Sequence, residues 1–214
     1  MTKLEELLEL SASRHNHLCP RQVLGVRMGL CAADILGLEL PQEDKRLFTF
    51  IETDGCLMDG VSVSTGCWAG RRTMRVMDFG KMAATFIDTV MGKTVRIAPH
   101  PNVRLAVKDQ AQHPDDSWHA YLLAYQSMPV EELLVVQPVK LIVSMRSIIS
   151  SESARAYCQC CGEEIFNERE VRFEEQILCK ACAGQAYYGT LSETENHRDV
   201  LTSVSEGVIC KSPL

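Results

Sequence analysis

Two pairs of closely spaced cysteines near the C-terminus constrain this chain more than any other feature of its sequence. Seventeen residues separate the pairs, which are Cys158-x2-Cys161 and Cys179-x2-Cys182. Two pairs of this kind supply four thiolates, which is the donor set of a tetrahedral structural zinc site. Gly162 permits a tight turn after the first pair, and residues 171–178 predict a hairpin that returns the chain to the second pair. The sequence therefore predicts a structural Zn²⁺ in a zinc-ribbon or treble-clef module.

The predicted module is too small to fold on apolar burial alone. A unit of about 40 residues has little core, so metal binding would supply much of its folding free energy. The alternative is four buried or redox-active thiols that hold no metal. Cys160 lies between the two cysteines of the first pair, and the spacing leaves open whether it exchanges with a neighbour as a ligand.

Cysteine content and charge limit the compartment and the partners. The chain has ten cysteines and no basic, apolar leader at its start, so we expect a cytoplasmic protein with reduced thiols. It has no apolar run near the roughly 18 residues of a membrane span. Residues 151–214 carry 6 Lys/Arg against 11 Asp/Glu, which disfavours nucleic acid as a partner of the zinc module and favours protein contacts.

A second group of metal-ligand residues stands near the N-terminus, in the segment His15-Asn-His17-Leu-Cys19-Pro20. Imidazole and thiolate suit zinc, iron, nickel or copper. In an extended segment alternate residues share a side, so the two histidines and Cys19 are predicted to converge on one metal. Cys56 and Cys67 are the candidates to complete its shell. The alternatives are a redox-active or nucleophilic Cys19 and a purely structural cluster.

Hydrophobic patterning predicts an α+β protein with a boundary near residue 152. Residues 1–152 would form one metal-binding domain, and residues 153–214 the zinc module with a tail. Helices are predicted at 2–13, 20–36, after Pro101 and at 118–126, and strands at 47–53, 74–79, 84–90, 94–97 and after a helical turn at 130–133. The glycine-rich segment at 53–70 reads as turns, in which Asp54, Asp59 and Asp78 are either turn residues or carboxylates that orient a metal-bound histidine.

Three motifs together resemble the FmdE-like family, which comprises subunits of molybdenum- and tungsten-dependent formylmethanofuran dehydrogenase. They are HNHLCP at 15–20 with LGVRMG after it, TDGCLMDGVSVSTGC at 53–67, and DFGK at 78–81. The tail YCQCCGEEI with ILCKAC matches the zinc module that many members append. These segments cover most of the chain in the family's order.

The resemblance implies an α+β domain with a mixed sheet and packed helices, like the catalytic domain of glyceraldehyde-3-phosphate dehydrogenases, often as a homodimer. It also implies that His15, His17, Cys19 and Cys56 surround a metal. This chain departs from the family's H-G-H-x-C-P-G at Asn16 and Arg21, and from its T-G-C-T-x-G-K at Trp68 and Arg71.

Three functional hypotheses follow from these patterns. The first is a metal-binding accessory protein of a molybdenum- or tungsten-type metalloenzyme, or of a metal-cofactor pathway, with Zn, Ni or Fe at the N-terminal site. The second is a metal-dependent enzyme whose metal keeps an open coordination position and activates water or a carbonyl. The third is a metal- or redox-sensing adaptor or regulator. The residues alone leave it undecided whether the protein is an enzyme.

Overall fold

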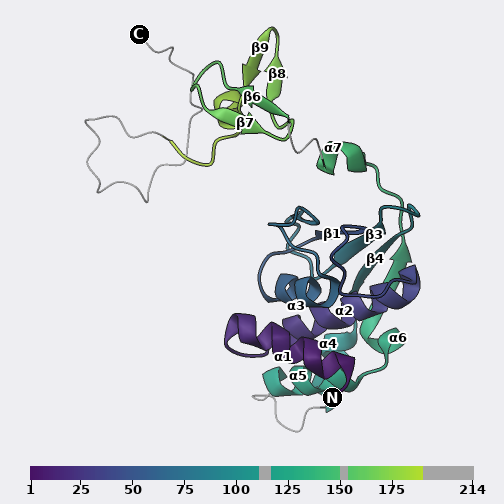
Figure 1. The fold of residues 1–214 in the computed structure, drawn as a ribbon. Coiled ribbons are helices and arrows are strands. Elements are labelled where there is room, and N and C mark those ends of the chain that lie inside the picture. The colour runs from purple at the N-terminus through teal and green to yellow at the C-terminus, as the bar shows by residue number, and fades with distance from the viewer. Residues whose placement is uncertain (111–116, 150–153, 190–214) are drawn as a thin grey trace, which may run out of the picture. The chain divides into compact units, whose positions relative to one another are not determined.

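The computed structural model describes residues 1–110, 117–149 and 154–189 (Figure 1). The chain divides into two compact units, Met1–Ile142 and Val143–Leu214. The predicted boundary at residue 152 and the predicted tail from residue 193 lie outside the described residues.

A five-stranded mixed sheet forms the centre of the first unit (Figure 1). Its strands are β1 Leu47–Ile51, β2 Met74–Val76, β3 Ala84–Asp88, β4 Thr94–Pro99 and β5 Leu134–Pro138. They lie in the order β2-β1-β3-β4-β5, with β1 and β2 parallel and the other neighbours antiparallel. The predicted α+β class with a mixed sheet is confirmed.

Helices gather against this sheet in Figure 1, and α2 contacts both β3 and β4. The helices are α1 Lys3–His15, α2 Pro20–Leu36, α3 Cys56–Thr65, α4 Val103–Gln110, α5 Ser117–Ser127 and α6 Val130–Leu133. The predicted helices and strands are confirmed to within a few residues. Gly37 ends α2 in the left-handed conformation with φ 67°, as its position after the apolar run predicts.

The prediction of turns at residues 53–70 is wrong, because residues 56–65 form helix α3. The segment contains glycine and β-branched residues, which are poor helix formers. Tertiary packing overrides that preference, since α3 lies with its backbone directly on α2. A Cβ atom on Gly25 would lie 2.8 Å from the Val61 nitrogen, and one on Gly60 would lie 2.9 Å from the Val26 nitrogen. Only glycine permits so close an approach.

The second unit consists of one short helix and two hairpins. Helix α7 Met145–Ile149 lies within the serine-rich stretch of the sequence. Strands β6 Arg155–Tyr157 and β7 Glu164–Phe166 form the first hairpin. Strands β8 Val171–Phe173 and β9 Gln176–Leu178 form the second, which confirms the predicted hairpin at 171–178. A helical turn, Ala181–Gln185, follows.

None of the described helices has the length and apolar character that crossing a membrane requires.

Candidate metal centres

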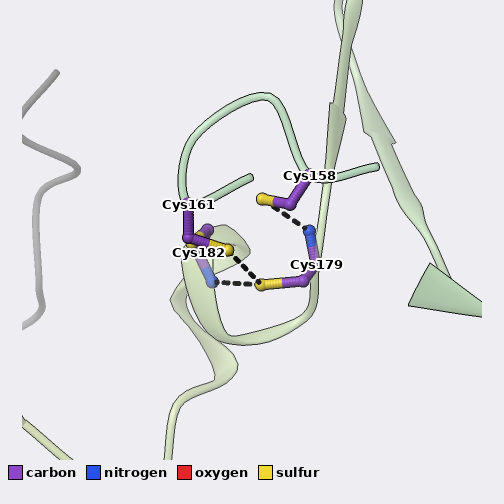
Figure 2. Close-up of side chains that lie close together, drawn as sticks. All are labelled: Cys158, Cys161, Cys179 and Cys182. Atoms are coloured by element: carbon purple, nitrogen blue, oxygen red, sulfur yellow. Dashed lines mark hydrogen bonds between the residues drawn. The ribbon is translucent and has the colours of Figure 1, made fainter. Parts of the chain in front are cut away.

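Four cysteine thiols converge in the second unit (Figure 2). The sulfurs of Cys158, Cys161, Cys179 and Cys182 all lie within 4.8 Å of one another. A tetrahedral zinc with Zn–S bonds of about 2.3 Å places its sulfurs about 3.8 Å apart. The Sγ atoms of Cys161 and Cys179 already lie 4.0 Å apart. This arrangement therefore requires only small adjustments to hold one tetrahedral metal ion.

Local backbone structure places these thiols. Cys158 follows β6 and Cys161 lies in the turn before β7, where Gly162 has φ 77° and its N–H donates to the Cys158 carbonyl at 2.8 Å. Cys179 follows β9, and Cys182 lies in the helical turn. The four are therefore brought together by the two hairpins, as the spacing predicted.

Backbone N–H groups point at the sulfurs before any metal is considered. The Cys179 N–H donates to the Cys158 sulfur at 3.2 Å, and the Cys182 N–H donates to the Cys179 sulfur at 3.3 Å (Figure 2). Burial alone would raise the pKa of Cys158, but N–H groups of residues 160, 161 and 179 outweigh it and lower that pKa to about 6.

The remaining thiols resist losing their protons beside the first thiolate. Burial and the neighbouring cysteines raise the pKa of Cys182 to about 12. The pKa of Cys161 is also raised, although the Glu163 N–H opposes the effects of burial and of Cys158. A site that favours one thiolate and opposes the next needs a bound cation before all four can ionise.

The N-terminal cluster is assembled from three helix ends. His15 is the last residue of α1, and Asn16 ends that helix with φ 60°. Cys19 is the N-cap of α2, followed by Pro20 at the first helical position. Cys56 is the first residue of α3. The predicted extended segment therefore has a different geometry, since His15 is helical.

His15 connects the cluster to a carboxylate. Its Nε2 lies 3.4 Å from the Cys56 sulfur, and its Nδ1 lies 3.3 Å from Asp59 Oδ2. The Cys19 thiol lies within hydrogen-bonding reach of Cys56, and burial together with this neighbour raises the pKa of Cys56. An imidazole held by a carboxylate at one nitrogen presents the other toward a ligand or metal.

The other predicted N-terminal ligands stand differently. The His17 ring packs edge-on against the His15 ring with a centroid distance of 4.9 Å, and its side chain is exposed. Cys67 follows the far end of α3, about 15 Å along the helix from Cys56 at 1.5 Å per residue. It is buried and donates to the Leu47 carbonyl at 3.3 Å. Cys67 is therefore separated from the cluster.

The predicted ligands are less tightly gathered at the N-terminal site than at the C-terminal one. Within the described ranges, the four-thiol group is the one set of three or more His, Cys, Asp or Glu side chains found close enough to hold a metal. Cys160 is not a member of this set.

Gln22 positions Cys19, a role that the sequence pattern had not indicated. Its Oε1 accepts from the Cys19 N–H at 2.8 Å, and its Nε2 donates to the Ser11 carbonyl at 2.9 Å. The side chain is fully buried. A glutamine three residues after a helix N-cap is a capping signal that could have been recognised in the sequence.

A cavity of about 630 Å³ adjoins the N-terminal cluster, and the sequence did not predict it. Cys19 and Cys56 form part of its wall. The rest comes from the loop before β3, the end of β4, and helices α4 and α5. A cavity of this volume accommodates a small organic molecule.

Comparison with known proteins places this first unit in a family. Residues 14–135 match the family described as FmdE, molybdenum formylmethanofuran dehydrogenase operon. The matched segment is more than half of the chain. This chain belongs to the FmdE family. The match contains His15, His17, Cys19 and Cys56, and it ends before the four C-terminal cysteines.

Two individual proteins extend the comparison. A curated relative from Archaeoglobus fulgidus, described as a probable S-adenosyl-L-methionine-binding protein, is 30% identical over 212 residues. The alignment covers 87% of this chain and 55% of the relative, so this FmdE-family chain spans about half of that protein's length.

A solved structure shares the fold. It is an FmdE-like protein of tungsten formylmethanofuran dehydrogenase from Syntrophus aciditrophicus, with a TM-score of 0.56 at 20% sequence identity. The superposition covers 86% of this chain and 94% of the other. The predicted resemblance to this family is thereby confirmed. Family membership and the four-cysteine group make this a metal-binding type of protein associated with the formylmethanofuran dehydrogenase operon.

Proposed function

We propose that this protein is a metal-binding accessory protein of a molybdenum- or tungsten-type metalloenzyme or metal-cofactor pathway. It would hold a transition metal through His15, Cys19 and Cys56, with His17 as a further candidate ligand. A structural Zn²⁺ would be held by the four C-terminal cysteines. The observation that carries the proposal is the line of contacts from Asp59 through His15 to Cys56, beside Cys19.

The donor set of the N-terminal cluster fits a transition metal. One imidazole nitrogen and two thiols are soft or borderline ligands, which suit Zn, Ni or Fe and are poor ligands for Mg²⁺ or Ca²⁺. Asp59 already occupies Nδ1 of His15, which leaves Nε2 beside the Cys56 sulfur. A bound metal would supply Lewis acidity there. The chain's own contribution is to hold the imidazole in one orientation and the two thiols at adjoining helix starts.

The accessory role is supported by the family and by the chemistry of the chain. The family description refers to an operon of a molybdenum enzyme, and the fold relative is described as an FmdE-like protein of a tungsten enzyme. The second unit adds a four-thiol site whose size and N–H to sulfur bonds suit zinc.

The proposal is tested by the metal content per chain, measured by elemental mass spectrometry on protein purified without a metal-affinity tag. We expect about two metals per wild-type chain and a loss of about one in the double variant Cys19→Ala/Cys56→Ala. Cys31→Ala is the matched control, because Cys31 is a buried cysteine of the same unit outside the cluster. Unchanged metal content in a folded double variant would refute the N-terminal site.

A metal-dependent enzyme is the second candidate, because Cys19 and Cys56 line a cavity of about 630 Å³. A metal at these thiols with an open coordination position could act on a small molecule in that cavity. Turnover of a substrate that is abolished in Cys56→Ala would favour the enzyme over the accessory protein.

A further inference from the structure

The cavity beside Cys19 and Cys56 is lined by basic and apolar side chains. Its basic residues are Arg21, Lys81, Arg96 and Arg104, with His100 in addition. Its lining contains no aspartate or glutamate. An excess of cationic side chains around a small cavity with low-dielectric walls produces a positive potential that attracts anions.

One of these cations is already neutralised within the protein. Arg96 makes two hydrogen bonds to the Glu52 carboxylate, at 2.6 and 2.7 Å, and a third to the Gln137 side chain at 3.0 Å. In the described part of the chain no ion pair joins Arg21, Lys81 or Arg104 to a carboxylate. Three positive charges of the lining are therefore available to a ligand.

Aromatic side chains form the other part of the wall. Tyr121 and Tyr125 are buried, and Trp118 is partly exposed at the start of α5. The Arg104 guanidinium lies over the Tyr121 ring, 5.4 Å from its centroid. This contact holds a cation at the edge of an aromatic surface, a combination that binds planar anions. Leu24, Met82 and Val103 add apolar surface to the same cavity.

We propose that this cavity binds a small organic anion, with its acidic group against Arg21, Lys81 and Arg104 and its apolar or aromatic body against Trp118, Tyr121 and Met82. Arg21 replaces the glycine of the family motif resembled here, so it gives this chain a cation that a member with glycine lacks. The proposal does not depend on the proposed metal, because none of these six side chains is among the proposed ligands.

The two tryptophans of the chain allow a direct binding measurement. Trp118 lines the cavity and Trp68 does not, so a Trp68→Phe background restricts the tryptophan emission to the cavity. The probe is 8-anilinonaphthalene-1-sulfonate, an aromatic anion that accepts energy from tryptophan. Its neutral match is N-phenyl-1-naphthylamine, which has the same ring system without the sulfonate.

We expect saturable binding of the anion with energy transfer from Trp118. Replacing Lys81 or Arg104 with Gln should weaken the anion about tenfold, the usual scale for a hydrogen bond to a charged group, and should leave the neutral probe unchanged. Lys140→Gln is the control, because Lys140 is a cation of the same unit that does not line the cavity. Equal effects on both probes, or anion binding that survives both substitutions, would overturn the proposal.

Competition then defines the acidic group and separates this proposal from the metal sites. Benzoate and phenyl phosphate should each displace the probe, and their relative strength distinguishes a carboxylate from a phosphate ligand. S-adenosyl-L-methionine carries a sulfonium cation, so we expect it to compete less well than either anion. Stronger competition by it would contradict an anion site. Repeating the titration with Cys19→Ala/Cys56→Ala should leave probe affinity within about twofold, whatever the outcome of the metal analysis.

Discussion

Asp88, at the end of β3, is a nearly fully buried carboxylate whose partners are all identified. Arg46 donates to its two oxygens at 3.0 and 2.6 Å, and the Val90 and Met91 N–H groups donate to Oδ1 at 3.0 and 3.1 Å. The hydrogen bonds from Arg46 lower the pKa of Asp88 to about 2, against an opposing effect of burial.

This low pKa has a definite consequence for stability against pH. A carboxylate with a lower pKa in the folded state stabilises it fully above its unfolded value of 3.8 and loses that effect as pH falls toward about 2. Asp88→Asn should therefore cost about 2 kcal/mol of unfolding free energy at pH 7. Urea denaturation at several pH values should show the difference from wild type narrowing below about pH 4. Asp34→Asn, on the exposed side of α2, serves as control. A difference independent of pH would contradict this assignment.

Asp59 is the residue that orients His15 in the proposed metal site. Asp59→Asn keeps the size of the side chain but weakens its hold on the imidazole. Loss of such a partner usually lowers metal affinity about 10- to 100-fold. Competition with a chromophoric chelator should show this loss for the N-terminal metal only. Asp54→Asn, in the exposed turn before α3, should leave both metals unchanged. An unaltered affinity in Asp59→Asn would show that the carboxylate has no role there.

Residue spacing predicted the C-terminal ligands well and the N-terminal ones less fully. The four cysteines are joined by short turns and hairpins, so sequence distance determines spatial distance. Cys56 and Cys67 looked equivalent in the sequence, and the structure separates them because a helix lies between them. Asp59 could be a turn residue or an imidazole partner until α3 placed it beside His15.

At the scale of elements, the contact between α2 and α3 determines the geometry of the cluster. Both helices begin at a cysteine of the cluster, Cys19 as N-cap and Cys56 as first residue. Hydrophobic periodicity and turn composition could not predict α3, because its helical state depends on the close approach of Gly25 and Gly60 to the opposite backbone. Most other elements of the first unit were predicted, since their patterns agree with their tertiary surroundings.

Gly60→Ala tests that contact. Its added methyl group would meet the Gln22 carbonyl and lie 2.9 Å from the Val26 nitrogen, so the helices must move apart. We expect a loss of about 2 kcal/mol in unfolding free energy, within the usual cost of overpacking. The matched control is Gly70→Ala, whose nearest neighbour would be a Trp68 ring carbon at 3.6 Å. Calorimetry should show a lower midpoint for Gly60→Ala alone, and equal midpoints would refute the account of α3.

At the scale of the whole molecule, the two units differ in how they are stabilised. The first has an extended apolar core from its helices and sheet. In the described part of the second unit, Cys158 and Ile165 are the buried apolar side chains. So small a core cannot stabilise the fold without metal. The cavity illustrates what sequence could not predict at this scale, because segments distant in the chain combine only in the folded unit.

Removal of metal should therefore unfold one unit selectively. After treatment with a strong chelator, we expect hydrogen exchange to accelerate at residues 155–185 and to remain slow in the β1, β3 and β4 strands. The measurement is hydrogen–deuterium exchange by mass spectrometry on the full chain. Re-addition of Zn²⁺ provides the control by restoring protection. Unchanged exchange at 155–185 after complete metal loss would contradict the structural role of the metal.

The most direct test of the proposed function is titration of the metal-free full chain with Co²⁺, followed by absorption spectroscopy. The account predicts two equivalents per chain, both with thiolate-to-cobalt charge-transfer bands, and a weaker band for the site with two thiolates than for the site with four. Cys56→Ala should reduce the N-terminal contribution and leave the four-thiolate spectrum intact. A single equivalent in wild type, with a spectrum identical to that of Cys56→Ala, would contradict the central claim that His15, Cys19 and Cys56 bind a metal.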